Sequence, residues 1–254
     1  MLETDAVVAA LMHARNEHIQ IDADALAHAV PNAEHAYAVQ MAVARHHGWY
    51  RDAPPRYWKS GGANREAQLT HAPLPPAGIW HSPARSGDWP FAMRGIEAEI
   101  ALRLGQPVDL ALARTLAPED AGDLVDAMTV SIEIVDSRWQ QGMASPALLK
   151  LADLQSHGAL VLGDWVPYQK LDWSQQACRV QVGNRPEVLR QGTHSLADPA
   201  WLLPQWLRQA CAMYGTLPAG TVVTTGTWVG ILQSQAGDRV KVVFDGIGEA
   251  SVAL

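Results

Sequence analysis

Two segments in the middle of the chain alternate apolar and polar side chains, and this pattern constrains the fold most. In GIEAEIALRLG, residues 95–105, apolar side chains occupy every second position, and Glu97 and Glu99 stand between them. In TVSIEIVDS, residues 129–137, the same alternation places Glu133 among small polar side chains. Successive side chains of a β-strand point to opposite faces of its sheet. Both segments are therefore predicted to be strands with one apolar face and one polar face.

The rest of the chain predicts helices first and mainly strands afterwards. Helical spacing of apolar residues predicts helices over 4–15, 33–46, 117–124, 146–155 and 199–213. Alternating runs bounded by turn residues predict strands near 158–163, 177–182, 220–225, 239–245 and 249–254. Pro- and Gly-rich residues 54–90 predict loops with short extended pieces such as RYWKS. We expect one α+β domain over 1–254, with a helical section over 1–52 and a β-rich body over 53–254.

Charge and composition exclude several classes of protein. The formal net charge is -7, whereas nucleic acids and anionic membranes require a basic surface. The first residues lack the basic start of a signal peptide, and no apolar run approaches the roughly 20 residues of a membrane span. The two cysteines, Cys178 and Cys211, are far apart, as expected of a reduced intracellular chain. We therefore expect a cytoplasmic protein that acts on a small molecule.

The three glutamates are candidate metal ligands. Glu97 and Glu99 are two residues apart on one predicted strand, so their carboxylates point the same way. Glu133 lies on the polar face of the second strand. Oxygen donors without His or Cys suit Mg²⁺ or Mn²⁺. Glutamates also solvate exposed sheet faces at this spacing, so spacing alone leaves both interpretations open.

Lys59 is a candidate for binding an anion. It stands in RYWKSGGANR, between aromatic residues and a pair of glycines that let backbone N–H groups approach a ligand. A solvated loop lysine is the alternative. The ten histidines include no H-E-x-x-H motif, which disfavours zinc, and the chain has neither a P-loop nor a G-x-S-x-G motif.

Longer passages carry a resemblance over nearly the whole chain. They are, in order, AYAVQ, WKSGG, GIEAEIALRLG, SIEIVDSRW, KLADLQSHGALVLG, GTHSLADPAWLLPQWL and AGTVVTTGTWVGILQSQAGDRVKVVFDGIGEASV. Together they resemble the 2-keto-4-pentenoate hydratase group of the fumarylacetoacetate hydrolase (FAH) superfamily. The pairing of the E-x-E strand with the EIVDSR strand is the most specific element. The resemblance implies an FAH-like mixed β-roll or sandwich body behind the helical N-terminal section.

The same resemblance implies roles for the matching residues. It makes Glu97, Glu99 and Glu133 the ligands of Mg²⁺ or Mn²⁺, and Lys59 the active-site lysine. It also implies a homo-oligomer. The positions that it assigns to the substrate are Ser156, Thr225, Gly226 and Thr227.

One departure concerns the partner of Lys59. Hydratases of this group carry an acidic residue after the lysine, where it takes part in proton transfer. The corresponding stretch HAPLPPAGIWHS, residues 71–82, contains no Asp or Glu. His71 or His81 can substitute, because imidazole titrates near neutral pH, and His81 is our predicted catalytic residue. Each is otherwise an ordinary loop histidine.

The implied activity is that of a hydro-lyase, which adds water to 2-hydroxypenta-2,4-dienoate-type acids in aromatic-compound catabolism. A 4-oxalocrotonate-type decarboxylase and an acylpyruvate-type C–C hydrolase remain open. The decarboxylase needs cations for a second carboxylate, for which Arg65, Arg85 and Arg94 are candidates, and the hydrolase needs a His–Glu pair.

A catalytically inert binder of metal and 2-oxo acid is the non-enzyme alternative. Trp201 and Trp206 either anchor an interface with another protein or, as we prefer, pack in the core.

Overall fold

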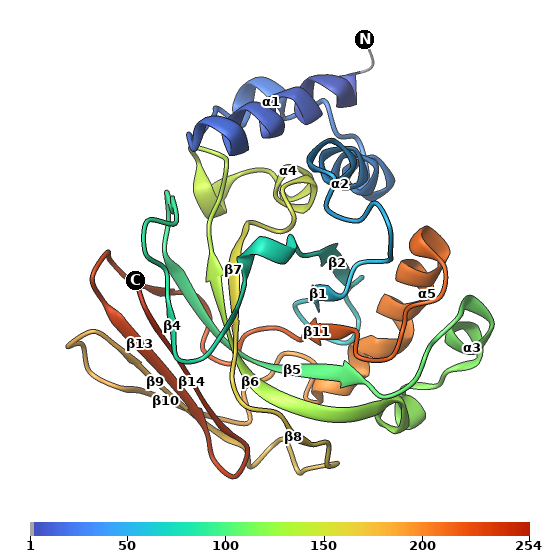
Figure 1. Ribbon diagram of the computed structural model, residues 1–254, viewed down its shortest axis with the longest axis vertical. Helices are drawn as coiled ribbons and strands as arrows, with labels where there is room; N and C mark the ends of the chain where they lie inside the picture. The colour runs from blue at the N-terminus through green and yellow to red at the C-terminus, as the bar shows by residue number, and fades with distance from the viewer. Residues whose placement is uncertain (1–2) are drawn as a thin grey trace.

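The larger of two sheets carries the alternating segments at its centre. The computed structural model describes residues 3–254, in which nine strands follow the path β2-β1-β11-β5-β6-β7-β3, with β12 beside β5 and β8 beside β6. These strands are β1 Tyr57–Gly61, β2 Thr70–Pro73, β3 Ile79–His81, β5 Gly95–Leu104, β6 Val125–Val135, β7 His157–Leu162, β8 Val166–Pro167, β11 Val222–Thr224 and β12 Leu232–Gln233. Figure 1 shows β5 and β6 as long curved strands through the middle of the molecule.

Both faces of the β5–β6 pair are covered. The antiparallel register places Glu97 opposite Glu133, as the alternation requires if the glutamates share a face. This face is polar but not solvated, because Glu99 and Glu133 are only 2% and 0% exposed. Further along, the same face carries a small apolar cluster that includes Ala101 and Leu160. The prediction of two strands is confirmed, and the alternative of a solvated outer face is excluded.

The smaller sheet packs its apolar face toward the larger one. Its order is β10-β9-β13-β14-β4. The strands are β4 Ala84–Arg85, β9 Ala177–Val182, β10 Val188–Gln191, β13 Arg239–Phe244 and β14 Gly248–Ala253. Val180 and Val242 from this sheet join Ile100 and Ile132 from the larger sheet in the main hydrophobic core. The two sheets and their helices form the predicted mixed α+β body.

The N-terminal helices form a separate layer above the sheets (Figure 1). They are α1 Glu3–Glu17 and α2 Ala33–His47, and α4 Ala147–Ala152 packs with them. Asn32 caps α2 by accepting a hydrogen bond from the His35 N–H, and Gly48 ends the helix in the left-handed conformation. These helices bury their own apolar cluster around Trp139.

The remaining helices lie beside the large sheet or in its connections. They are α3 Leu110–Thr115 and α5 Leu203–Tyr214, with short 3-10 turns at Asp24–Leu26, Pro76–Gly78, Pro118–Leu124, Gly142–Ala144 and Pro199–Leu202. The helix predicted over 117–124 is therefore wrong in type, because that segment is a 3-10 helix. Trp206 is fully buried in the core, as we preferred, and both cysteines are buried and free. Among the described residues, no helix is long and apolar enough to cross a membrane.

Candidate metal and substrate site

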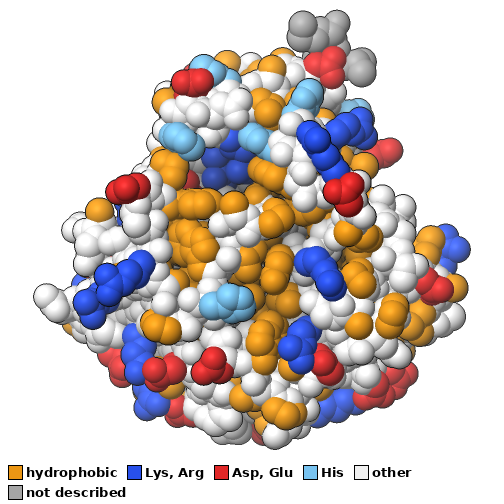
Figure 2. All heavy atoms as spheres, viewed as in Figure 1, with side chains coloured by type: hydrophobic (Ala, Val, Ile, Leu, Met, Phe, Trp, Pro, Cys, Tyr) orange, Lys and Arg blue, Asp and Glu red, His pale blue; other side chains and the backbone are white. Residues whose placement is uncertain are grey.

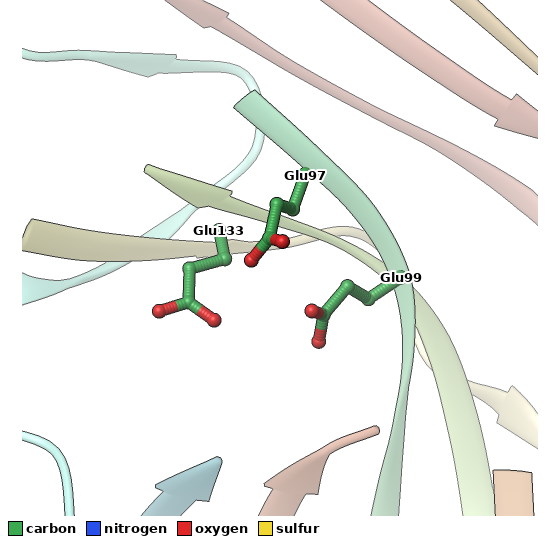
Figure 3. Close-up of side chains that lie close together, drawn as sticks. All are labelled: Glu97, Glu99 and Glu133. Carbon is green, nitrogen blue, oxygen red and sulfur yellow. The ribbon is translucent and has the colours of Figure 1, made fainter. Parts of the chain in front are cut away.

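The three predicted glutamates converge at one place on the inner face of the large sheet. Glu97 and Glu99 project from β5, and Glu133 projects from the neighbouring β6 (Figure 3). One carboxylate oxygen from each lies within 4.8 Å of the others. The alternation of each strand and the register between them are sufficient to produce this convergence.

Burial and mutual repulsion make this group of carboxylates unusual. Burial, together with the nearby Glu133 carboxylate, raises the pKa of Glu97 to about 8 and that of Glu99 to about 7. Burial also opposes ionisation of Glu133, but Lys59 and His157 together lower its pKa. If all three carboxyls were ionised, their negative charge would exceed the positive charge that the neighbouring protein groups supply, so Glu97 and Glu99 retain protons at neutral pH.

Lys59 supplies the positive charge within this site. Its Nζ donates a hydrogen bond to Glu133 Oε1 at 2.5 Å and another to the Gln155 carbonyl at 3.2 Å. Burial opposes the charge on Lys59, but the surrounding carboxylates outweigh it and raise the pKa of the ammonium. Lys59 is consequently cationic at neutral pH, and the solvated loop lysine is excluded.

A cavity of about 360 Å³ opens in front of these side chains. We call it the glutamate cavity; its lining includes Lys59, Gly62, Glu97, Glu99, Gln155, Gly226 and Thr227. The Gly226 N–H donates to Glu99 Oε2 at 3.1 Å, from a backbone φ of 100° that favours glycine. The loop after β11 thus places two of its three predicted substrate residues, Gly226 and Thr227, at the cavity.

The other predicted substrate residues lie off the glutamate cavity. Thr225 is buried, and its hydroxyl donates to the Ile100 carbonyl at 2.7 Å. Ser156 is also buried and lines a neighbouring cavity of about 330 Å³, which shares Gln155 with the glutamate cavity. Leu154, Gln155 and Ser156 are three successive non-glycine residues with positive φ, a strained arrangement of the kind found at functional sites.

Neither histidine proposed as the partner of Lys59 reaches the glutamate cavity. His81 is exposed at the end of β3. His71 is buried with its Nδ1 2.7 Å from the Ser60 hydroxyl, and burial lowers its pKa to about 3. Because Ser60 and Lys59 are adjacent on a strand, their side chains point to opposite faces. The structure therefore gives no support to the catalytic role predicted for His81.

Two residues in contact with the glutamates were missed by the sequence reasoning. His157 Nδ1 lies 3.1 Å from Glu133 Oε1, and the Thr224 hydroxyl donates to Glu99. Both stand next to residues that the family resemblance does assign, Ser156 and Thr225. That adjacency was the available signal. The sequence alone does not show whether a residue next to an assigned position points toward the site or away from it.

The side chains present fit a hard divalent cation. The three carboxylates form the only group of three or more metal-type ligands that residues 3–254 bring together. Glu133 Oε2 is buried without a hydrogen-bond partner. The raised pKa values of Glu97 and Glu99 mean that additional positive charge is needed to ionise both carboxyls at neutral pH. An all-oxygen set with open positions suits Mg²⁺ or Mn²⁺.

Comparisons with known proteins find relatives over most of the chain. Residues 38–253 match the family described as fumarylacetoacetate (FAA) hydrolase C-terminal. The 2-keto-4-pentenoate hydratase 1 of Dechloromonas aromatica (strain RCB) is 30% identical over 244 residues, covering 88% of this chain and 86% of that protein.

Solved structures share the fold at lower sequence identity. The 4-oxalocrotonate decarboxylase from Pseudomonas putida G7, complexed with magnesium and adipate, gives a TM-score of 0.79 at 18% identity and covers 98% of this chain and 97% of its own. The 5-carboxymethyl-2-hydroxymuconate delta-isomerase from Mycobacterium smegmatis gives 0.54 at 19% identity, covering 79% and 78%. The chain belongs to the fumarylacetoacetate hydrolase superfamily and, within it, to the group that contains the 2-keto-4-pentenoate hydratases.

Proposed function

We propose that the protein is a metal-dependent hydratase that converts 2-hydroxypenta-2,4-dienoate-type acids into 4-hydroxy-2-oxo acids. The observation that carries the proposal is the convergence of three glutamates, Glu99 and Glu133 buried and Glu97 half-buried, with Lys59 bonded to Glu133. Lys59, Glu97 and Glu99 line one cavity. The related hydratase supports the reaction type. A 2-hydroxydienoate of this kind is an intermediate of aromatic-compound catabolism, which is the setting we propose.

Glu97, Glu99 and Glu133 would hold Mg²⁺ or Mn²⁺, which supplies Lewis acidity toward the substrate's carboxylate and 2-oxygen. The protein's own side chains then transfer protons and position the substrate. During ketonisation the Lys59 ammonium donates a proton to C5, and Nζ is reprotonated by the proton of the 2-hydroxyl. Water next adds its oxygen to C4 and a proton to C3. Gly226 and Thr227 line the end of the cavity that receives the substrate's carboxylate.

The charges that line the cavity favour a monocarboxylic substrate over a decarboxylase substrate with two carboxylates. Among the described residues, Lys59 is the only Lys or Arg that lines the glutamate cavity. Arg65, one candidate for a second carboxylate, donates to the Leu196 carbonyl at 2.6 Å and lies over the Trp201 ring. Arg85 and Arg94 do not line the cavity either.

A C–C hydrolase is also disfavoured. The structure does contain a His–Glu pair, His157 with Glu133. His157 lines a different cavity, however, and the same Glu133 oxygen accepts a hydrogen bond from Lys59. This pair is therefore not placed to activate water beside a substrate in the glutamate cavity.

The test is a substrate panel with Mg²⁺ or Mn²⁺, followed by ultraviolet absorbance. We expect 2-hydroxypenta-2,4-dienoate to be consumed, and 2-oxo-3-hexenedioate and acylpyruvate to react much more slowly. Preferred turnover of either of the latter would replace the hydratase assignment. Binding of oxalate by calorimetry without turnover of any panel member would favour the inert binder.

Variants of the ligands test the site itself. Glu97→Ala and Glu133→Ala are expected to lower turnover by at least about 100-fold, because even residues that only support metal ligands cost up to that factor when removed. Glu249→Ala, which removes a carboxylate from an exposed ion pair, is the matched control and should leave turnover unchanged. Wild-type turnover and metal affinity in both site variants would refute the metal assignment.

A further inference from the structure

A second cavity lies beneath α1, between that helix and the sheet body. Its volume is about 250 Å³, and we call it the α1 cavity; its lining includes Arg15, Trp49, Trp89, Asp136, Arg138 and His157. Figure 2 shows the face hollowed beneath the top helices, with Lys or Arg atoms deep in the hollow, His on either side and hydrophobic atoms below. The hydratase proposal makes no use of this cavity.

Two arginines bring net positive charge to the wall of the α1 cavity. Arg15 and Arg138 both bond Asp153, at 2.9 and 2.7 Å, and Asp153 is fully buried and does not line the cavity. Asp136 does line it; its Oδ1 accepts a hydrogen bond from the Met93 N–H, and its Oδ2 lies 3.7 Å from Arg138 Nη1. Two arginines and one carboxylate therefore line the cavity. Burial lowers the pKa of Arg15 only to about 10, so Arg15 remains cationic at neutral pH.

The arginines also keep hydrogen-bonding capacity. Arg15 Nε and Arg138 Nη2 are buried without a partner in the described part of the chain. An N–H group in that position gains from a charged acceptor such as a carboxylate oxygen. No side-chain oxygen on the residues lining this cavity, within 3–254, is left buried and unpartnered. The unpartnered side-chain atoms on these residues are the two guanidinium nitrogens and the Nε2 atoms of His47 and His157.

The other walls are flat and apolar. The Trp49 ring stacks on His47 with centroids 4.7 Å apart, and Arg15 lies over the same indole at 5.5 Å. Trp89 is held edge-on by Trp80 at 5.3 Å. Indoles fixed by their neighbours offer large surfaces to a planar ligand without losing side-chain freedom on binding.

We propose that the α1 cavity is a second ligand site, which binds a small carboxylic acid with a flat apolar body. The carboxylate is bound by the guanidinium groups of Arg15 and Arg138, and the apolar body packs against Trp49 and Trp89. The site is distinct from the glutamate cavity and needs no metal. Its existence does not depend on which reaction the protein catalyses.

Calorimetry of the full chain with benzoate tests the proposal, with the glutamate cavity blocked by saturating Mg²⁺ and oxalate. Benzoate should bind at one site per chain, and benzamide, which has the same shape without the charge, about tenfold more weakly. Arg15→Gln should weaken benzoate binding by about tenfold. Its matched control is Arg190→Gln, on the exposed strand β10, which should have no effect.

A cavity-filling variant keeps the test valid if the arginine variant folds poorly. Ala92 is exposed and lines the cavity, so Ala92→Trp adds bulk without removing any charge or core contact, and it should abolish benzoate binding. Glu97→Gln should leave benzoate binding intact. The proposal is overturned if benzoate does not bind at millimolar concentration, if it binds Ala92→Trp as wild type, or if Mg²⁺ and oxalate displace it.

Discussion

The residues that line the glutamate cavity and those that line the α1 cavity differ in the sign of their excess charge, and one residue connects the two groups. His157 bonds Glu133 of the first group and lines the second cavity. On one side three carboxylates face one lysine, and on the other two arginines face the cavity with one engaged carboxylate. A buried charge left without a full set of protein partners is costly unless a ligand completes it. The excess sign therefore indicates what each cavity binds: a cation in the first and an anion in the second.

The two groups differ as much in how their charges are anchored. Asp153 receives hydrogen bonds from Arg15 Nη2, Arg138 Nε and the Arg138 backbone, so the arginines are fixed from behind by a fully satisfied carboxylate. The glutamates have no equivalent second cation behind them. The arginine group should hence stabilise the fold, whereas the glutamates should cost stability until a metal binds.

The largest effect is expected at Asp153, the carboxylate that fixes the two arginines. Asp153→Asn removes the carboxylate that both buried guanidinium groups contact, leaves Arg138 only its longer pair with Asp136, and should lower the free energy of unfolding by about 3–5 kcal/mol. Urea denaturation followed by circular dichroism measures this. Asp245→Asn removes a carboxylate from an exposed pair with Arg179 and should cost less than about 1 kcal/mol. An equal cost in the two variants would show that the buried arginines need no anchor.

The glutamates, unlike the arginine group, should lower the free energy of unfolding of the metal-free protein as the pH is raised. Glu97 and Glu99 have folded-state pKa values of about 8 and about 7, above the ordinary value of 4.5. Between about pH 6.5 and 8 the unfolded chain has lost these protons while the folded chain still binds them. The free energy of unfolding of the metal-free protein should then fall as pH rises, by about 2 kcal/mol over this range.

The other shifted groups near the site do not obscure this window. Burial lowers the pKa of His71 to about 3, so His71 makes stability rise with pH, but only below about pH 6.5. The pKa of Lys59 is raised from 10.5 and that of Glu133 is lowered from 4.5, so both contributions are constant here. Saturating Mg²⁺ and, separately, Glu97→Gln should flatten the slope. A slope unchanged by either would remove the glutamates as its cause.

The fold was predictable where periodicity acts within one segment. Strands β9, β13 and β14 and helix α2 lie within a residue or two of their predicted ranges, because each buries one regular face. Strands of two or three residues, such as β3 and β4, carry no readable period. They exist because they pair with β7 and β14, which are distant in sequence. The curvature that buries the second face of β5–β6 is likewise a product of long-range packing.

The candidate site was predictable in its ligands and not in its surroundings. Glu97, Glu99 and Glu133 follow from alternation plus the resemblance of whole passages. His157 and Glu133 are 24 residues apart, and Thr224 and Glu99 are 125 apart. No local pattern encodes contacts of that kind. His81 is the converse case: its residue type and its stretch of sequence suit the predicted role, but its side chain is exposed at the end of β3, an edge strand of the sheet.

The smallest predicted effect decides whether His157 or His81 acts at the metal site. His157 orients Glu133 by a hydrogen bond from Nδ1, and burial lowers the pKa of His157, so it acts as a neutral donor. Removal of a residue that orients a metal ligand costs about tenfold or more in metal affinity, so His157→Ala should raise the Kd for Mg²⁺ by about that factor. His157→Asn places an amide N–H near the position of Nδ1 and should restore most of the loss. His81→Ala should change neither metal affinity nor turnover. If His81→Ala abolished turnover while His157→Ala bound Mg²⁺ as wild type, the role predicted from the sequence would stand and the one inferred from geometry would fall.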